Sequence, residues 1–432
     1  MAKTYDTYKD SGIAWIGEIP GEWEVCRLKD TSSLYTGNSI KDEKKDYYED
    51  KNDARPYIAT KDIDATYMTA NYENGLYIKH ADNNFRIAPP FSSLMCIEGG
   101  SAGRKKTFID REVSFVNKLC CFAPLKGVLG KYIYYFLCSP NFEDIFNSKI
   151  TGLIGGVNIP TLKNIECLLP PLSVQQSISS FLDTKCGEID SLISIQEEMI
   201  SELLAYKQSV ITEAVTKGLD KKAKMKNSGV EWIGDIPEEW ELARIGNFFQ
   251  LRSERNTKPM DEVLLLSLYT GIGVFPHGEQ EERGNKAVTV DGYKIVHKND
   301  IVVNIILAWM GAIGISNYNG VTSPAYDIYI PNLAKVVPHY FHYVFRTKGI
   351  AGECYKYGRG IMMMRWRTYS TEFKQISIPV PPLPVQQAIA TYLDEKTSQI
   401  DSLIALKQSK IESLKEYKKS IIYEYVTGKK RV

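Results

Sequence analysis

The sequence has 432 residues and carries 53 basic against 52 acidic side chains, a formal net charge of +1. Its 44% of hydrophobic and 24% of charged residues are typical of globular proteins, which excludes a mostly disordered chain and a fibrous repeat. The length allows two to four domains, and the near-zero charge gives by itself no sign of a nucleic-acid partner.

Signals for targeting and for covalent cross-links are weak. The longest apolar stretch, 301–315, is shorter than the roughly 18 residues of a membrane helix and contains Asn304, so it predicts buried strand and turn. The first residues have no apolar run of the signal-peptide kind, and we therefore expect a cytoplasmic protein that contacts no membrane. The eight cysteines form no C-x-x-C pair, which favours buried free thiols over a disulfide framework or a zinc site.

The first element in chain order is a tryptophan motif that occurs twice. Residues 11–28 read SGIAWIGEIPGEWEVCRL and residues 228–245 read SGVEWIGDIPEEWELARI, with 11 of 18 positions identical. We predict that its tryptophans are packing anchors against the helices described below rather than base-stacking groups, because a repeated frame should not carry sequence specificity. The four residues are Trp15, Trp23, Trp232 and Trp240.

Each tryptophan motif is followed by a block, 29–169 and 246–380, and the two blocks show little mutual similarity. Short β-branched or aromatic runs between turn residues predict strands, and two longer runs predict helices. The expected strands are 55–60, 93–98, 113–123, 263–269, 301–307 and 325–330, and the expected helices are 130–148, interrupted by Pro140, and 338–348. With its motif, each block has about 150 residues, enough for a core of its own.

Each block ends in a long segment that also repeats, since residues 170–216 and 381–427 match at 24 of 47 positions. Apolar residues recur at alternating spacings of four and three, which predicts a coiled-coil seam, and Gly218 and Gly428 mark the helix ends. Seam positions include Leu182, Ile189, Ile193, Leu393, Ile400 and Ile404. Because one helix alone cannot bury such a seam, we predict two helices of about 40 residues that pair antiparallel.

Polar residues interrupt both seams at matching positions, Gln196 with Lys407 and Lys207 with Lys418. Such residues can fix the register of a coiled coil, or their heads can simply reach solvent at the edge of the seam. The first helix holds three basic and seven acidic side chains and the second holds nine and six, and this opposite charge favours their pairing.

The sequence thus predicts an α+β protein with a pseudo-two-fold internal repeat, in which two mixed α/β domains are joined by an antiparallel coiled coil. The expected division is a first domain at 1–169, a first helix at 170–219, a solvated linker at 220–226, a second domain at 227–380 and a second helix at 381–432.

No catalytic constellation emerges from the sequence. There is no phosphate-binding G-x-x-x-x-G-K-[ST] loop, and the glycines of 99–103 lack the G-x-G-x-x-G spacing. The tetrapeptide at 88–91 begins with alanine, which cannot hold a target amino group as the first residue of the amino-methyltransferase motif does. His339 and His342 have no third ligand nearby in sequence, so partial exposure on a helix is favoured over a metal site. We therefore expect a non-catalytic chain without metal or bound cofactor.

The motifs W-I-G-x-I-P-x-x-W and P-P-L-x-x-Q-Q-x-I-x-x-x-L-D, each occurring twice, resemble those of the specificity subunit of type I restriction–modification enzymes. The resemblance covers essentially the whole chain, and it departs from the family pattern at Gln175 and Gln386, where the family often has glutamate. It implies that 1–169 and 227–380 are target recognition domains, each reading one half of a bipartite DNA sequence. It also implies that the paired helices set the gap between the halves.

The resemblance further implies which partners the chain has. These are double-stranded DNA, two modification subunits that bind S-adenosylmethionine and methylate adenine, and two restriction subunits that use ATP and Mg. Glutamines at the two helix starts are candidates for docking the modification subunits, although the helix N-terminus alone also explains them. They are Gln175, Gln176, Gln386 and Gln387.

DNA contacts require Lys and Arg at phosphates, and Arg, Asn, Gln, Ser or Thr at base edges. The loops after both tryptophan motifs are polar and basic, and each block has one further basic cluster, with ordinary solvated surface as the alternative. The candidates are Asn38, Ser39, Lys41, Lys44, Lys45, Arg104, Lys105 and Lys106 in the first block, and Arg252, Arg255, Asn256, Lys258, Lys356, Arg359, Arg365 and Arg367 in the second. Since both blocks are nearly neutral, we expect tight DNA binding only together with the modification subunits.

Two alternative functions stay open. One is the specificity half of a related methylation or phage-defence complex without a restriction subunit, which neighbouring genes would distinguish. The other is a coiled-coil scaffold whose lobes bind proteins rather than DNA. A methyltransferase in its own right is disfavoured by the missing cofactor loop.

Overall fold

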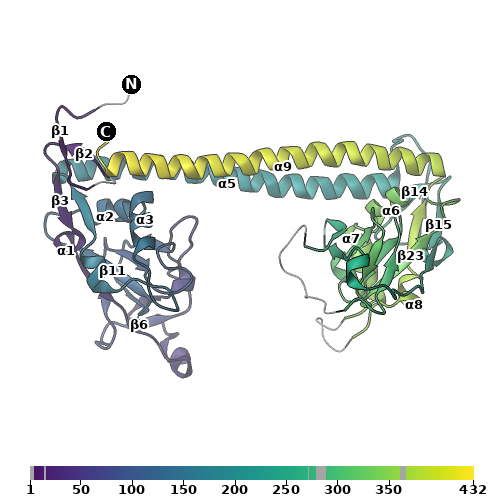
Figure 1. Cartoon of the computed structure of the whole chain (residues 1–432), viewed down its shortest axis with the longest axis horizontal. Helices are drawn as coiled ribbons and strands as arrows, with labels where there is room; N and C mark the ends of the chain where they lie inside the picture. Colours follow the sequence, from purple (N-terminus) through teal and green to yellow (C-terminus); the bar gives the residue numbers. More distant parts are fainter. Residues whose placement is uncertain (1–3, 14–15, 271, 279–288, 361–365) are drawn as a thin grey trace. The chain divides into compact units, whose positions relative to one another are not determined.

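The structure, a computed structural model, describes residues 4–13, 16–270, 272–278, 289–360 and 366–432, without the side chains of Asp42 and Lys44. The chain forms two compact units. Unit 1 comprises Met1–Glu197 with Lys407–Val432, and unit 2 comprises Glu198–Leu406, so that each unit contains one block and parts of both long helices (Figure 1). No helix in the described ranges is long and apolar enough to cross a membrane.

Unit 1 is built on two four-stranded sheets. The first is antiparallel in the order β4 (Ser32–Thr36), β11 (Leu119–Pro124), β8 (Ser93–Cys96) and β9 (Lys106–Phe108). The second has the order β6 (Tyr77–Lys79), β5 (Ala54–Ile58), β10 (Val113–Phe115) and β7 (Ile87–Ala88), with β5 and β10 parallel. Leu94, Phe115 and Cys121 belong to one buried core cluster, which therefore draws on both sheets.

Short helices complete the first block. They are α1 (Leu28–Thr31), α2 (Gly130–Leu137), α3 (Pro140–Ser148) and α4 (Ile159–Lys163), with the 3-10 turns η1 (Asp42–Tyr48) and η2 (Thr60–Asp62). The expected helix 130–148 is two helices because Ser139 caps α3, accepting the N–H of Phe142, and Pro140 begins it. The expected strand 113–123 is likewise two strands, because the chain turns after β10 and the N–H of Leu119 donates to the carbonyl of Val116.

Unit 2 contains a sheet of the same kind. It is antiparallel in the order β16 (Phe249–Leu251), β23 (Tyr326–Pro331), β20 (Ile301–Asn304) and β21 (Ile313–Ile315). Two further pairs, β17 (Leu266–Tyr269) with β18 (Gly273–Pro276) and β19 (Lys294–Val296) with β22 (Gly320–Thr322), are joined by a parallel bridge between Leu265 and Val321. The helices are α6 (Pro338–Val344), α7 (Lys348–Tyr357) and α8 (Ser370–Phe373), with the 3-10 turns η3 (Ile245–Asn247), η4 (Met260–Glu262) and η5 (Ala308–Met310).

The two blocks therefore share one topology although their sequences differ. Strands β4, β11, β8 and β9 correspond to β16, β23, β20 and β21, while β6, β5, β10 and β7 correspond to β18, β17, β22 and β19. The parallel contact between β5 and β10 in unit 1 has its counterpart in the bridge from Leu265 to Val321 in unit 2. The predicted α+β architecture with an internal repeat is confirmed, and the repeat extends into the blocks.

A buried tyrosine holds each block to the end of a long helix. The hydroxyl of Tyr132 in α2 donates to the carbonyl oxygens of Leu168 (3.0 Å) and Val426 (3.3 Å). The hydroxyl of Tyr340 in α6 donates in the same way to the carbonyl oxygens of Val215 (3.0 Å) and Pro379 (3.4 Å). Since a buried hydroxyl without partners is costly, these bonds favour one position of each block on its helix end.

Two small strand pairs frame each block. In unit 1, β1 (Tyr8–Asp10) pairs with β2 (Glu18–Pro20), and β3 (Glu24–Arg27) pairs with β12 (Glu166–Leu169). In unit 2, β13 (Met225–Asn227) pairs with β14 (Asp235–Pro237), and β15 (Glu241–Arg244) pairs with β24 (Ser377–Val380). Strand β13 includes the last two residues of the expected 220–226 linker, which is thus shorter than the sequence suggested.

The tryptophan motifs lie against the ends of the long helices. A Cβ at Gly428, after the second helix, would lie 3.3 Å from Trp23, and a Cβ at Gly218, after the first, would lie 3.0 Å from Trp240. Both glycines have positive φ, 70° and 76°, so that the close approach and the turn each require glycine. Trp232 is half-buried against the core of unit 2, and Trp15 lies outside the described residues.

The long helices are α5 (Leu172–Lys217) and α9 (Leu383–Val426). In unit 1, the ring of Phe181 lies 4.4 Å from that of Tyr425, and Lys418 contacts Asp190 at 2.7 Å. Residue numbers thus rise along one helix as they fall along the other, which confirms the predicted antiparallel pairing. Six seam positions are buried: Leu182, Ile189, Ile193, Leu393, Ile400 and Ile404.

Polar seam residues contact the opposite helix in both units. In unit 2, Lys207 contacts Asp401 at 2.7 Å, which is the pseudo-equivalent of the contact between Lys418 and Asp190 in unit 1. Lys407 also lies 3.4 Å from the side-chain oxygen of Gln196. These lysines are therefore engaged across the seam rather than only reaching solvent, as the register hypothesis requires.

Candidate nucleic-acid interface

One end of the first sheet of unit 1 gathers polar loops. Strands β4 and β8 end there and β11 begins there, since Thr36 is opposite Cys120 and Cys96 is opposite Leu119. Asn38, just beyond β4, holds these loops together. Its backbone N–H donates to the carbonyl of Phe115, and its side-chain oxygen accepts the backbone N–H of Arg86 at 2.8 Å. Asn38 thus has a structural role in these loops, and its expected DNA contact stays a prediction for its half-buried side-chain amide.

The side chains around Asn38 remain exposed to solvent. The hydroxyl of Ser39 donates to the side-chain oxygen of Asn117 at 2.7 Å, and the guanidinium of Arg86 donates to the carbonyl of Thr36 at 3.1 Å. Lys118 follows Asn117 and is exposed as well. We call Ser39, Arg86, Asn117 and Lys118 the sheet-end surface. It combines a fixed guanidinium, an amide and an ammonium group, which suits hydrogen bonding to base edges and phosphates.

Only part of the sheet-end surface was accessible to sequence reasoning. Ser39 was among the candidates, whereas Arg86, Asn117 and Lys118 were not, because they lie far from Ser39 in the chain. Of the other candidates in this loop, Lys41 and Lys45 are exposed, and the side chain of Lys44 lies outside the described part of the structure.

The basic run 104–106 does not form one patch. Lys106 is fully buried, with its ammonium 2.8 Å from the carboxylate of Glu143 and 2.7 Å from the carbonyl of Leu137, so its expected DNA contact is corrected to a structural ion pair. Lys105 donates to the carbonyl of Thr60 at 2.9 Å, and Arg104 is exposed. Lys106 begins β9, whose first two residues are buried, whereas Arg104 and Lys105 precede the strand, which explains the split.

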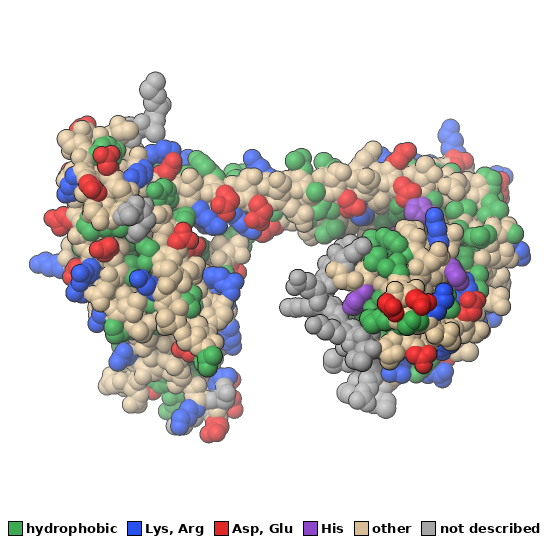
Figure 2. Space-filling view, viewed as in Figure 1, with side chains coloured by type: hydrophobic (Ala, Val, Ile, Leu, Met, Phe, Trp, Pro, Cys, Tyr) green, Lys and Arg blue, Asp and Glu red, His purple; other side chains and the backbone are tan. Residues whose placement is uncertain are grey.

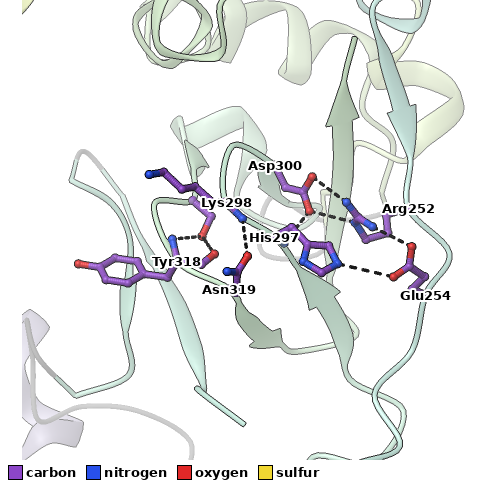
Figure 3. A network of polar contacts seen from close by, with 8 residues as sticks. Arg252, Glu254, His297, Lys298, Asp300, Tyr318 and Asn319 are labelled. Atoms are coloured by element: carbon purple, nitrogen blue, oxygen red, sulfur yellow. Dashed lines mark hydrogen bonds and ion pairs between the residues drawn. The ribbon is translucent and has the colours of Figure 1, made fainter. Parts of the chain in front are cut away.

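In unit 2 the first candidate, Arg252, is part of a polar network beside β20 (Figure 3). Its guanidinium makes two hydrogen bonds to the buried carboxylate of Asp300, at 2.9 and 3.0 Å, and one to Glu254 at 2.8 Å. Asp300 also accepts the backbone N–H of His297. Only 9% of the Arg252 side chain is exposed, so this residue fastens the loop rather than offering a free charge to DNA.

The rest of that loop divides in the same way. The amide of buried Asn256 donates to the carbonyls of Lys258 and Val290, which gives it a structural role and corrects the expected DNA contact. Arg255 and Lys258 are exposed, and Arg255 donates to the carbonyl of Gly292 at 3.1 Å. These two side chains remain available to a partner of unit 2.

The basic cluster 356–367 is partly neutralised by acids. Lys356 lies 3.6 Å from Glu353 and Arg359 lies 2.6 Å from Glu372, both with the lysine or arginine side chain exposed. Arg359 and Arg367 exchange two backbone hydrogen bonds of 3.0 Å, and Arg367 is exposed, whereas Arg365 lies outside the described residues. On the face drawn in Figure 2, acidic and basic side chains are interspersed over both units. On this face, local clusters rather than a broad basic surface would therefore have to meet DNA.

The glutamines at the helix starts differ within each pair. Gln175 is buried and accepts the N–H of Leu129 at 2.8 Å while donating to the carbonyl of Pro170 at 2.8 Å. Gln386 is buried as well and accepts the N–H of Val337 at 2.7 Å. The expected docking role of Gln175 and Gln386 is thus corrected to an internal one. Gln176 and Gln387 are exposed and remain candidates for a subunit contact.

A second set of residues that the sequence reasoning missed lies where each block meets its helices. In unit 1, Tyr135 donates to Asp183 at 2.6 Å, and Lys131 lies 3.0 Å from the same carboxylate. The neighbouring cavity of about 440 Å³ is lined by these three residues together with Asp190 and Lys418.

Unit 2 repeats this arrangement with other residue types. Tyr343 donates to Asp394 at 2.6 Å, and His339 lies 2.7 Å from that carboxylate. Burial lowers the pKa of the neighbouring His342 to about 3, which leaves it neutral. No group of three or more His, Cys, Asp or Glu side chains suited to a metal ion occurs among the described residues. In the sequence, the feature that both blocks share at this contact is a Tyr-x-x-Tyr pair, 132 with 135 and 340 with 343.

Comparison with known families agrees with the repeated architecture. The type I restriction modification DNA specificity domain matches the chain twice, over residues 20–204 and 237–416. The chain belongs to this family. Each match spans most of one block and most of the long helix that follows it, so the family unit is the block together with its helix.

Curated relatives include specificity subunits from archaea and bacteria. The putative type I restriction enzyme MjaX specificity subunit of Methanocaldococcus jannaschii is 27% identical, over 96% of this chain and 96% of its own. The type I restriction enzyme EcoKI specificity subunit of Escherichia coli K12 is 24% identical over 48% of this chain and 45% of its own length.

Solved structures support the same fold. A chain from a study of complex assembly and conformational transition in the type I R-M system has a TM-score of 0.69 at 13% identity, covering 94% of this chain and 98% of its own. The HsdS subunit from Thermoanaerobacter tengcongensis has a TM-score of 0.51 at 14% identity, covering 95% and 98%. This specificity-subunit fold is thus kept although few residues are shared.

Proposed function

We propose that the two blocks of this specificity subunit together with their tryptophan motifs, 1–169 and 227–380, are target recognition domains that each read one half of a bipartite DNA sequence. The observation that carries the proposal is the combination of one shared topology with different exposed side chains. Where unit 1 presents the sheet-end surface, unit 2 presents Arg255 and Lys258 on another framework of loops. Two domains that share one fold but expose different side chains are suited to bind two different half-sites.

We also propose that the paired helices, 170–219 and 381–432, set the gap between the half-sites. A helix of the length of α5, 46 residues, spans roughly 69 Å, about two turns of duplex DNA. The linker at 220–226 connects the first helix to the second tryptophan motif. Burial of the apolar seam stabilises the two helices against each other, and a stable helix has a length fixed by its number of residues, as a spacer requires.

We further propose that the chain assembles with modification and restriction subunits. A frame that occurs twice offers two equivalent docking surfaces, which favours two modification subunits per chain, and exposed Gln176 and Gln387 lie at equivalent positions of that frame. These subunits would supply S-adenosylmethionine-dependent adenine methylation, and two restriction subunits would supply the ATP- and Mg-dependent steps. The specificity chain itself binds and positions DNA and performs no chemical step.

The decisive experiment is co-expression with the modification subunit from the same genome, followed by mapping of methylated adenines in host DNA. We expect one bipartite motif with a fixed gap. Replacing residues 227–380 by the corresponding block of a related subunit should change one half of that motif and leave the other half and the gap unchanged. Methylation without any bipartite motif, or a complex without DNA affinity, would instead favour a protein-binding scaffold.

A further inference from the structure

A tight hairpin beside the sheet-end surface of unit 1 exposes two apolar side chains at its tip. Leu153 is 109% exposed and Ile154 is 70% exposed, and Leu153 is the most exposed large hydrophobic residue in the described ranges. The two residues lie between Gly152 and Gly155, whose φ angles are 83° and 72°. None of the described residues of unit 1 covers this tip, so its apolar surface is presented to solvent.

The hairpin is firmly held despite its exposure. Thr151 and Gly156 exchange two backbone hydrogen bonds, of 2.9 and 3.1 Å. The backbone N–H of Gly99 donates to the carbonyl of Gly155 at 2.7 Å, and a Cβ at Gly156 would lie 2.9 Å from the carbonyl oxygen of Ile97. The tip is therefore pre-organised, and ordering it on binding costs little conformational entropy.

The hairpin adjoins the surface that we assign to DNA. The segment 97–99, which holds the hairpin, also donates from the N–H of Ile97 to the carbonyl of Lys118. Exposed Lys149 begins the hairpin, and exposed Arg104 follows the turn after Gly99. Half-buried Glu98 is the acid on this segment. Three exposed cations, Lys118, Lys149 and Arg104, thus lie on or next to the segments that hold the apolar tip, an arrangement that complements the phosphates and bases of a duplex.

Unit 2 has a backbone bridge at the equivalent place. The N–H of Thr368 donates to the carbonyl of Ile305, as that of Val157 donates to Ile97 in unit 1, and Arg359 and Arg367 form the bridge that corresponds to Thr151 and Gly156. The sequence between these arginines is GIMMMRW, of which residues 361–365 lie outside the described structure. In sequence, both blocks therefore carry aliphatic residues between the two partners of this bridge, with a basic residue nearby.

We propose that Leu153 and Ile154 form an apolar wedge that inserts into the base stack of the half-site read by unit 1, which rests on the proposed DNA-reading function. Leu, Ile and Met are the side-chain types that partly unstack base steps in proteins that deform DNA, and flexible steps accept them at lower cost. The wedge would therefore add a preference for a deformable step to the base contacts of the sheet-end surface.

The test uses the full complex with its modification subunits and a duplex that carries the mapped target. The bases of that half-site are replaced one at a time by 2-aminopurine, whose fluorescence increases when it is unstacked. The methylated adenine is left unchanged, because the modification subunit itself unstacks that base. We expect an increase at one step with the wild-type complex. The double variant Leu153→Ser with Ile154→Ser should lose that increase and bind about tenfold or more weakly, by the loss of two apolar contacts.

The matched control is Leu125→Ser. Leu125 is 41% exposed and follows β11, so it lies at the opposite end of the same sheet, and it should leave fluorescence and affinity unchanged. Failure of the wild-type complex to bind its target would contradict the proposed function. Normal wild-type binding with an unchanged double variant would overturn the wedge alone. A double variant that no longer assembles with the modification subunits would also overturn it, since the tip would then contact protein.

Discussion

At the scale of single residues, the type of a side chain does not determine whether its charge is available. Lys106 and Arg104 are two positions apart, yet the first is buried against Glu143 and the second is exposed. Arg252 and Arg255 differ in the same way. The partners of the buried cations, Glu143 and Asp300, lie 37 and 48 residues away in the sequence. Sequence reasoning therefore found the basic clusters but not which of their members face solvent.

This difference can be tested with Lys106→Met and Arg104→Ala. Lys106→Met leaves the Leu137 carbonyl without its donor and Glu143 without its ion pair, and should lower the free energy of unfolding by about 2 kcal/mol, a value reduced because Glu143 is partly exposed. Arg104→Ala should leave stability unchanged and weaken DNA binding by the complex. Urea denaturation and binding titrations measure the two effects. Equal loss of DNA affinity at unchanged stability would instead make Lys106 a DNA contact.

A second residue-scale prediction concerns Cys26, the one cysteine that is not fully buried. A hydrogen bond from the thiol of Cys167, 3.4 Å away, lowers the pKa of Cys26, whereas burial raises the pKa of Cys120 and Cys354. A lower pKa means more thiolate at a given pH, so Cys26 should be alkylated first by iodoacetamide near neutral pH, as mass spectrometry of peptides can show. In Cys167→Ala the midpoint of its pH–rate profile should move upward, and an unmoved midpoint would contradict this hydrogen bond.

At the scale of elements, the apolar period and the proline and glycine residues at helix ends predicted the long helices well. Sequence similarity between the two blocks predicted little of their shared fold. The ends of α5 lie within two residues of the expected 170–219, because proline pairs and glycine act on the backbone locally. Helix α9 ends at Val426, beside Gly428, the residue that the sequence marks as its end within the expected segment 381–432. The equivalence of α2 and α6 was missed, because the tyrosine pair is embedded in otherwise different residues. Packing preserved their contacts while the remaining side chains changed.

An element-scale prediction follows from the glutamines at the start of α5. Gln175→Leu removes an acceptor from the N–H of Leu129 and a donor from the carbonyl of Pro170, both at the junction of the block with its helix. Leaving such groups unpaired should lower the free energy of unfolding by about 2 kcal/mol. Gln176→Leu, at the exposed neighbouring position, is the control and should leave stability unchanged. Thermal unfolding of both variants decides between an internal role for Gln175 and a purely intermolecular one.

At the scale of the whole molecule, the net charge of +1 is compatible with DNA binding only because the cations are arranged locally. The sheet-end surface concentrates Arg86 and Lys118 with two amide or hydroxyl groups, whereas Lys106 and Arg252 are neutralised internally. The amino-acid composition cannot show which cations are exposed and which are paired internally, since it counts buried and exposed charges alike. The isolated chain should therefore bind DNA weakly, with a shallow dependence on salt, and the modification subunits should supply most phosphate contacts.

The spacer role of the helices gives the prediction that separates geometry from base reading. Inserting seven residues after Gln196 in α5 and seven after Lys407 in α9 adds one seven-residue seam repeat to each helix, so that the apolar positions stay on one face. The insertion lengthens each helix by roughly 10.5 Å, or about three base pairs of duplex. Methylation mapping should then find the same two half-sites with a gap about three base pairs longer.

Inserting four residues into α5 alone is the control for this experiment. It rotates the seam beyond the insertion, so that the contacts of Lys207 with Asp401 and of Lys418 with Asp190 can no longer form together, and it should lower stability rather than produce a new gap. If the symmetric insertion changed the half-sites themselves, the helices would take part in base reading. If it left the gap unchanged while the complex remained active, the distance between the half-sites would be set by the modification subunits, and the helices would serve only to hold the two blocks in one chain.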